Sequence, residues 1–488
     1  MARDQAPKRC VIIISLTIRL PCWAFIKQIR EFIPVIKQRF FIEARDVLKL
    51  AWPLLIAQIT QMLMGVSDTI MAGRYSATDM AAVALGFSIT IPLLCFIQGI
   101  ALALPPIISR LHGNKNISGI ANASQQAGYL VLFVGLLIAA LVPFTEAIVS
   151  LFPMAPELHT ITVDYVIYVF IAMPGFAIYQ WLRNYCEGLG KTKPTMIITV
   201  IGLMANVVGN YLFIYGVGPL PAMGGAGCGV ATALVIYTML VATIIYVKFA
   251  PALAKYALFT YWYRPDLKVI GRTFAMGLPI AMTILFEVTL FSAVALLIAP
   301  FGANVVAAHQ VALNFSALMF MFPMSIGMAV AIRIGYRIGQ NNIRQAKIAA
   351  RSAILIGFVT SACTATFTLV AKGFIIGLYT NDSEVYALAN ALLIYAALFQ
   401  LSDAVQVISA NALRGYKDTT AMFLITFVSY WLIGLPTGVV LGRTSWLTAE
   451  PMAAAGFWIG FIVGLSAAAV LLGARLLYIQ RKTAVLKA

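Results

Sequence analysis

The chain has 488 residues, of which 61% are hydrophobic and only 10% are charged, and its formal net charge is +17. Soluble domains carry about 25% charged residues, so this chain has too little charge to cover a water-exposed surface of its size. The composition excludes an ordinary soluble fold and indicates an integral membrane protein.

Apolar stretches long enough to cross a bilayer, which requires roughly 20 residues in a helix, recur along the whole chain. Taken in order, these runs and the turn residues between them predict twelve transmembrane helices in an all-α fold. The predicted spans are residues 50–72, 81–108, 117–144, 161–182, 194–216, 226–247, 273–298, 305–332, 352–371, 385–411, 419–441 and 452–474.

The first 44 residues form a basic and apolar extension before the first predicted span. This extension contains Arg19 and Pro21 and has no small-residue cleavage site, which argues against a secretory signal peptide. We expect either a segment that lies in the membrane interface or a start assigned upstream of the true one, near Val35.

The positive charges fall almost entirely on one side of the predicted membrane. If the N-terminus is cytoplasmic, the cytoplasmic segments hold 31 Lys and Arg residues, and the other side holds only Arg74, Lys372 and Arg443. The positive-inside rule therefore predicts that both termini are cytoplasmic. We expect the excess charge to attract membrane lipid and not nucleic acid, because no nucleic-acid-binding motif accompanies it.

The two halves of the chain match each other at an offset of 226 residues, which pairs Pro53 with Pro279 and Gly113 with Gly339. Each half has six predicted spans, so both enter the membrane from the same side as parallel repeats. We expect two pseudo-symmetric six-helix lobes around a central cavity, as suits a transporter. The expected domains are residues 45–250 (N-lobe), 251–272 (cytoplasmic linker) and 273–488 (C-lobe and cytoplasmic tail).

Three acidic residues, Asp68, Glu287 and Asp403, lie within predicted spans, whereas the other fourteen lie in loops, in the N-terminal segment or at span ends. A charge at the centre of a spanning helix costs about 2.5–3.5 kcal/mol on insertion scales, and such residues often mark ion pathways. No Lys or Arg lies at a comparable depth, so a fixed salt bridge cannot neutralise them. We therefore predict that the three carboxylates meet a mobile partner, which is a proton, a sodium ion or a cationic substrate.

Polar residues in the same spans are candidates to support these acids. Asn206 and Asn210 are four residues apart and share a helix face available to Asp68 in the N-lobe. Tyr395 precedes Asp403 by eight residues. The carboxylates of Glu287 and Asp403 and the hydroxyl of Tyr395 would form an oxygen-rich, transient Na⁺ site. Two carboxylates held close together could equally accept a proton.

Other polar residues of the spans carry less weight. His309, Gln310 and Asn314 lie near or in the eighth span, and Gln61 is the repeat counterpart of Glu287. We expect His309 to be a structural histidine with satisfied hydrogen bonds, with a proton relay as the alternative.

Several long motifs resemble the NorM branch of the multidrug and toxic compound extrusion (MATE) family. They read MGVSDTIMAG, FEVTLFSAVALL, AAHQVALNFSALMFMFPMSIG, LSDAVQV, NALRGYKDT and SYWLIGLPTG. The resemblance implies a monomeric bacterial inner-membrane antiporter that exports organic cations, dyes and fluoroquinolone-like drugs against Na⁺ or H⁺. By matched motif, Asp68 resembles the N-lobe coupling acid, and Glu287 and Asp403 resemble the C-lobe cation-site acids.

Three alternative functions are weaker. A major facilitator transporter would show a GxxxDxxGRR-type loop where this chain reads SRLHGNKN. A lipid-linked precursor flippase of the same superfamily would favour a cationic cavity, whereas the intramembrane charges here are acidic. An enzyme is not indicated, because the chain has no HExxH, GxSxG or Walker A motif, and we expect no permanently bound cofactor.

Overall fold

The computed structural model describes the backbone of residues 22–485, apart from residues 220, 381 and 448–449, and the side chains from residue 38 to residue 483 with the same gaps. Residues 1–21 of the predicted N-terminal extension lie outside the described residues. From Cys22 onward the backbone is helical and continues without a break into the first span, so the predicted boundary at residue 44 is not a break in the backbone.

Within the described residues, twelve helices are long and apolar enough to cross a membrane, as the hydrophobic runs predict. The first half contains α2 (Cys22–Tyr75), α3 (Ala77–Ala101), α4 (Leu104–Gly113), α5 (Ile117–Ala139), η1 (Val142–Phe144), α6 (Thr145–Val149), α7 (Pro156–Gly188), α8 (Lys193–Tyr215) and α9 (Gly224–Phe249). Here α3 and α4 form one span, and α5 to α6 form another.

The second half follows the short helix α10 (Pro251–Ala254). It contains α11 (Leu267–Ile298), η2 (Ala299–Phe301), α12 (Ala303–Gly339), α13 (Ile343–Gly377), α14 (Ser383–Gly415), α15 (Thr419–Phe427), the π-helix η3 (Val428–Gly434), α16 (Leu435–Arg443) and α17 (Ala454–Val485). Here α11 and η2 form one span, and α15 to α16 form another.

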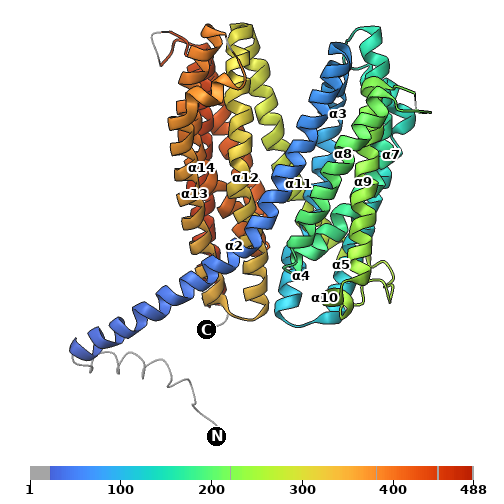
Figure 1. Cartoon of the computed structure of the whole chain (residues 1–488). Coiled ribbons are helices and arrows are strands. Elements are labelled where there is room, and N and C mark those ends of the chain that lie inside the picture. The colour runs from blue at the N-terminus through green and yellow to red at the C-terminus, as the bar shows by residue number, and fades with distance from the viewer. Residues whose placement is uncertain (1–21, 220, 381, 448–449, 486–488) are drawn as a thin grey trace.

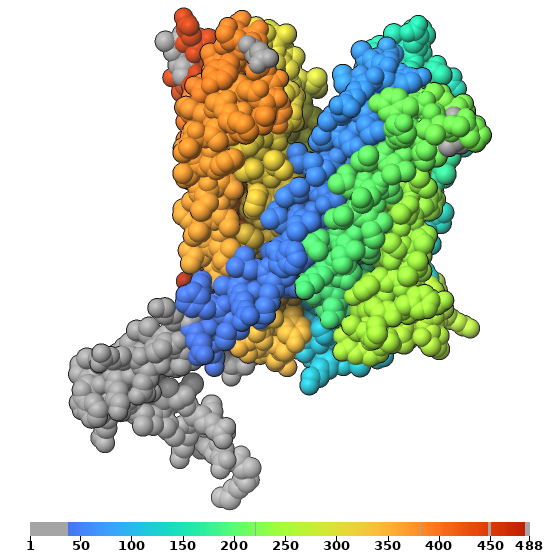
Figure 2. Space-filling view, viewed as in Figure 1, coloured from blue at the N-terminus to red at the C-terminus, as the bar shows by residue number. Residues whose placement is uncertain are grey.

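The helices form two lobes that converge at one end of the molecule and separate at the other (Figure 1). The start of α2 and the end of α17 both lie at the converging end, which we call the termini side. A groove separates the lobes and opens away from the termini, with α2 running diagonally along it (Figure 2). Each lobe has its own buried apolar core.

The internal repeat extends to the geometry of a single loop. Lys115 and Asn341, which are 226 residues apart, both adopt the left-handed backbone conformation, with φ of 57° and 58°. The next residues cap the following helices in the same way, because Asn116 accepts from the Gly119 amide and Asn342 accepts from the Gln345 amide. The matched offsets in the sequence therefore reflect a repeated structure.

The first helix of each repeat crosses from one lobe to the other. Val47 and Leu54, near the start of the α2 span, belong to the core of the C-lobe, whereas Ala72 of the same helix belongs to the core of the N-lobe. In the second repeat, Ala281 of α11 packs in the N-lobe core, and Val294 packs in the C-lobe core. Thus α2 and α11 link the two lobes at the termini side.

The lobes also meet through glycines at the crossing of α4 and α12. A Cβ on Gly113 would collide with the carbonyl oxygen of Tyr336, and a Cβ on Gly339 would collide with the carbonyl oxygen of Arg110. Gly113 and Gly339 are repeat equivalents, and so are Arg110 and Tyr336. The reciprocal contact therefore places the pseudo-two-fold axis at this crossing, and only glycine permits so close an approach.

Candidate functional site

The N-lobe acid lies between α2 and α8, where two asparagine side chains bind it. Asn206 and Asn210 donate hydrogen bonds of 2.8 Å and 2.7 Å to the same carboxylate oxygen of Asp68. Both asparagines are buried, and Asp68 is half-buried. The helix spacing that places the two asparagines on one face of α8 thus brings them to the predicted carboxylate, which faces the interior of the lobe.

The C-lobe acids lie on neighbouring helices. Asp403 of α14 is only 3% exposed, and Glu287 of α11 is half-buried. The two carboxylates are close enough to interact electrostatically. Among the described residues, neither forms an ion pair with Lys, Arg or His, and the same holds for Asp68. The three acids therefore have no fixed basic partner within the described part of the chain.

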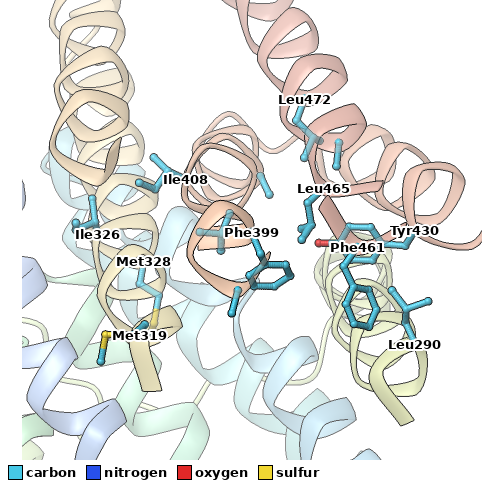
Figure 3. Close-up of a cluster of buried hydrophobic side chains, with 14 of the residues drawn as sticks. Leu290, Met319, Ile326, Met328, Phe399, Ile408, Tyr430, Phe461, Leu465 and Leu472 are labelled. Atoms are coloured by element: carbon cyan, nitrogen blue, oxygen red, sulfur yellow. The ribbon is translucent and has the colours of Figure 1, made fainter. Parts of the chain in front are cut away.

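The structure adds Tyr430 to the C-lobe site, a residue that the sequence did not single out. Tyr430 is buried and lies within electrostatic range of both Glu287 and Asp403, and its hydroxyl has no hydrogen-bond partner among the described residues. It lies in the π-helix η3, and π-helical turns often occur at functional sites. Figure 3 shows its side chain next to Phe461 in the buried apolar cluster of the C-lobe.

An aromatic cluster holds η3 against α11 beside Glu287. The ring of Phe286 lies 5.0 Å from that of Phe427 and 5.9 Å from that of Trp431. The indole nitrogen of Trp431 also donates a 3.2 Å hydrogen bond to the carbonyl oxygen of Phe286. Because Phe286 precedes Glu287 in the chain, this cluster positions the acid-bearing turn of α11 against the π-helix.

Tyr395, predicted as a further cation ligand, is partly buried and packs against the C-lobe core. Among the described residues its hydroxyl forms no hydrogen bond that joins it to Glu287 or Asp403, so its role in the site remains a prediction. Tyr430, in contrast, lies within electrostatic range of both acids.

The remaining polar residues that the sequence singled out fall into two groups. His309 is fully buried beside Trp458, and neither ring nitrogen has a hydrogen-bond partner among the described residues. The expected set of satisfied hydrogen bonds is therefore absent among the described residues. In contrast, Gln310 and Asn314 are exposed on α12, and Gln61 is half-buried on α2. These three side chains make no contact with the acids that the structure records.

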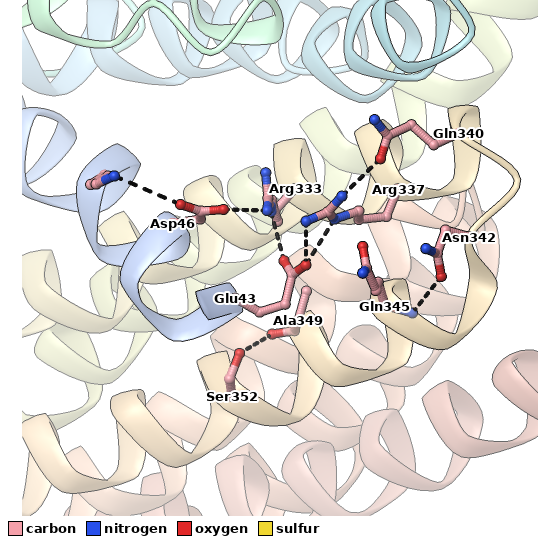
Figure 4. A network of polar contacts seen from close by, with 10 residues as sticks. Glu43, Asp46, Arg333, Arg337, Gln340, Asn342, Gln345, Ala349 and Ser352 are labelled. Atoms are coloured by element: carbon pink, nitrogen blue, oxygen red, sulfur yellow. Dashed lines mark hydrogen bonds and ion pairs between the residues drawn. The ribbon is translucent and has the colours of Figure 1, made fainter. Parts of the chain in front are cut away.

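The termini side is closed by an ion-pair network between α2 and α12 (Figure 4). Arg333 donates to Glu43 at 2.7 Å and also pairs with Asp46. Arg337 pairs with the other oxygen of Glu43 at 2.6 Å and donates to Gln340. Glu43 is only 1% exposed, so its charge depends on these two guanidinium groups.

Comparison with known proteins identifies the family. The MatE family model matches residues 53–212 and 279–440, which are the two repeats. The chain is 45% identical over 447 residues to multidrug resistance protein MdtK of Proteus mirabilis, covering 91% of this chain and 98% of that protein. It is 46% identical over 445 residues to multidrug resistance protein NorM of Vibrio cholerae, covering 91% and 97%.

Solved structures share the fold. A eukaryotic MATE transporter superposes with a TM-score of 0.81 at 20% identity, covering 91% of this chain and 99% of that one. An outward-facing multidrug resistance MATE family transporter superposes with a TM-score of 0.80 at 19% identity, covering 91% and 97%. Both the family model and the relatives cover the repeats that carry the three acids. The chain therefore belongs to the NorM-type MATE family of membrane transporters.

Proposed function

We propose that the protein exports organic cations and related drugs across the bacterial inner membrane by antiport against Na⁺ or H⁺. The observation that carries this proposal is the set of three intramembrane carboxylates without a fixed basic partner among the described residues. Acids in a membrane interior are retained where they serve an ion or substrate pathway. The relatives named above are multidrug resistance proteins, which supports the same function here.

The orientation in the membrane follows from the distribution of Lys and Arg. The positive-inside rule places the termini side in the cytoplasm, so the groove between the lobes opens to the outside (Figure 2). We take this arrangement as the outward-open state of a monomeric transporter. Exposed Gln310 and Asn314 on α12 would then face water in the groove, since a lipid-facing amide is unfavourable.

The coupling ion would bind at the acids. Glu287 and Asp403 with the Tyr430 hydroxyl provide oxygen ligands suited to Na⁺, and the same carboxylates can accept a proton. In the N-lobe, the asparagine amides donate to one oxygen of Asp68, and a cation or proton can engage the other. Binding of the ion would weaken attraction for a cationic drug, which would then leave to the outside.

Return to the inward-open state requires the termini side to separate. The glycine contact between α4 and α12 must then break, and the ion pairs that tie Glu43 to Arg333 and Arg337 break with it if the start of α2 moves with the N-lobe. The acids Asp68 and Glu287 lie on α2 and α11, the two helices that cross between the lobes. Neutralisation of these acids can therefore act directly on the helices that must bend or shift for alternating access.

The test is active efflux from proteoliposomes that contain the purified full-length chain. A fluorescent organic cation is loaded inside, and either a sodium gradient or a proton gradient is imposed. We expect one gradient to drive efflux in the wild type and neither to drive it after Glu287→Gln or Asp403→Asn. Efflux at the wild-type rate in both variants would overturn the assignment, and Glu157→Gln, at an exposed acid on the outer side, is the matched control.

A further inference from the structure

A second cavity lies on the termini side, away from the three acids. It has a volume of about 620 Å³ and is lined by α2, α4, the connection from α7 to α8, α9 and α12. Of these, α4, the α7–α8 connection and α9 belong to the N-lobe, α12 belongs to the C-lobe, and the start of α2 packs on the C-lobe core. We call this cavity the basic pocket, and it lies next to the ion-pair network that closes the termini side.

The pocket has an excess of positive charge. Lys49, Lys191, Lys193 and Arg333 line it, against a single lining carboxylate, that of Asp46. Arg333 already binds this carboxylate, and Lys49 approaches it only at 3.9 Å with a side chain that is 59% exposed. Among the described residues, Lys191 and Lys193 form no ion pair. Two or three ammonium groups in the pocket are therefore available to an anion.

The rest of the lining is amphipathic. Tyr246 and Tyr336 offer hydroxyl groups, and the ring of Tyr336 lies 5.3 Å from that of His112. Leu50 and Ile332 supply an apolar wall. A ligand that fits this lining has a phosphate group for the lysines and a less polar portion for the apolar wall, which is the chemistry of a phospholipid headgroup and its glycerol.

We propose that the basic pocket binds the phosphate group of an anionic phospholipid from the cytoplasmic leaflet. Basic pockets between transmembrane helices on the cytoplasmic side are suited to anionic headgroups. A phosphate held by Lys191 and Lys193 on the N-lobe would also lie near Arg333 on the C-lobe, so it bridges the two lobes. Bound lipid would therefore stabilise the closed termini side and bias the transporter toward its outward-open state.

The first experiment measures lipid binding and is independent of transport. Native mass spectrometry of the full-length chain in detergent is used to titrate phosphatidylglycerol and, separately, phosphatidylcholine. The pocket variant carries Lys49→Gln, Lys191→Gln and Lys193→Gln. The control variant removes three exposed basic residues of the termini side that do not line the pocket, by Lys268→Gln, Arg272→Gln and Arg351→Gln.

We expect phosphatidylglycerol to bind the pocket variant between about tenfold and 100-fold more weakly than the wild type, because the loss of each lysine should weaken the affinity several-fold. The control variant should bind it as the wild type does, and phosphatidylcholine should show no dependence on the three lysines. Equal loss in both triple variants would mean diffuse surface attraction and would overturn the proposal. So would unchanged binding by the pocket variant.

Competition with inorganic phosphate distinguishes binding of the lipid from binding of a soluble ligand that carries the same phosphate group. If the lipid is the ligand, phosphate in the millimolar range should not displace phosphatidylglycerol from the wild type, and displacement at lower concentration would overturn the assignment to lipid. Thermal unfolding of each variant in phosphatidylcholine reports whether it remains folded. Because drug efflux is not measured, these results stand or fall separately from the proposed antiport.

Discussion

The side-chain amide of Asn210 on α8 donates a 2.7 Å hydrogen bond to the carboxylate of Asp68 on α2. Its neighbour Asn206 donates to the same oxygen. The donors are neutral, so they orient the carboxylate without cancelling its charge. The N-lobe therefore holds this carboxylate in place through neutral amide donors.

This relationship predicts the effect of Asn210→Ala. A hydrogen bond to a charged group contributes about 1.5–3 kcal/mol, so its loss should slow cation-driven efflux by roughly tenfold or more as Asp68 loses its orientation. The measurement is the initial efflux rate in proteoliposomes at equal protein content. Asn304→Ala, at the outer end of α12, is the control that should leave the rate unchanged, and an unaltered rate in Asn210→Ala would exclude a coupling role for this contact.

The unpartnered hydroxyl of Tyr430 supplies the second prediction. Tyr430→Phe keeps the ring that packs next to Phe461 (Figure 3) but removes the oxygen near the two acids. If that oxygen is a cation ligand, the half-saturating concentration of the coupling ion should rise by roughly tenfold to 100-fold, with little change in protein stability. Ion-dependent efflux at varied ion concentration measures this. Tyr211→Phe, at an exposed tyrosine, should behave as the wild type, and equal half-saturation in Tyr430→Phe would remove Tyr430 from the site.

Most of the fold, and the acids of the candidate site, could be predicted from the sequence for physical reasons. Asp68, Glu287 and Asp403 stood out because a charge in an apolar run is costly, and Asn206 with Asn210 could be paired by helix periodicity alone. Tyr430 could not be identified in this way, because tyrosine is common in membrane helices and its position depends on the π-helical turn of η3. Helix periodicity assumes a regular α-helix, and η3 departs from it.

The crossing of α2 and α11 between the lobes was equally invisible in the sequence. The repeat offset predicts that two halves have the same fold, but it does not say which lobe packs against the start of each half. That information lies in tertiary contacts such as those of Val47 and Ala281. The ion pairs of Glu43 with α12 belong to the same class, since they join residues 290 and 294 positions apart.

The glycine contact at the pseudo-two-fold axis gives the third prediction. In Gly339→Ala the new methyl group would collide with the backbone of α4 at Arg110, and backbone cannot yield as a flexible side chain does. Overpacking costs about 1–3 kcal/mol, which should raise the fraction of molecules with a separated termini side. Spin labels at Lys115 and Arg351, on opposite lobes, would report longer distances in a background without native cysteines.

The control for this substitution is Gly271→Ala. Gly271 lies on the same side of the molecule, and no heavy atom outside its own helix turn lies within 4 Å of a Cβ built there. Its label-to-label distances should match those of the wild type. If Gly339→Ala also leaves the distances unchanged, the contact between α4 and α12 does not govern closure.

The fourth prediction concerns Glu43. Glu43→Gln keeps the shape of the side chain but leaves Arg333 and Arg337 without their shared carboxylate. Breaking one side of a buried ion pair costs about 3–5 kcal/mol, so the closed termini side should become much less populated. The same pair of labels should then show a larger separated fraction than in the wild type.

Glu146→Gln is the matched control, because Glu146 is exposed on α6 at the other end of the molecule. It should leave the distribution of distances unchanged. A Glu43→Gln variant with the wild-type distribution would mean that the network shown in Figure 4 stabilises the fold without controlling the opening of the termini side.

The fifth prediction tests the central claim, that a mobile cation and a cationic drug share Glu287 and Asp403, which have no basic partner in the described part of the chain. The measurement is displacement of a bound fluorescent organic cation from the purified protein during titration with Na⁺ and, separately, with H⁺. We predict that at least one of these ions displaces the dye from the wild type, and that Glu287→Gln and Asp403→Asn each abolish this displacement. Dye binding that is insensitive to both ions in the wild type, or equally sensitive in the variants, would contradict the account.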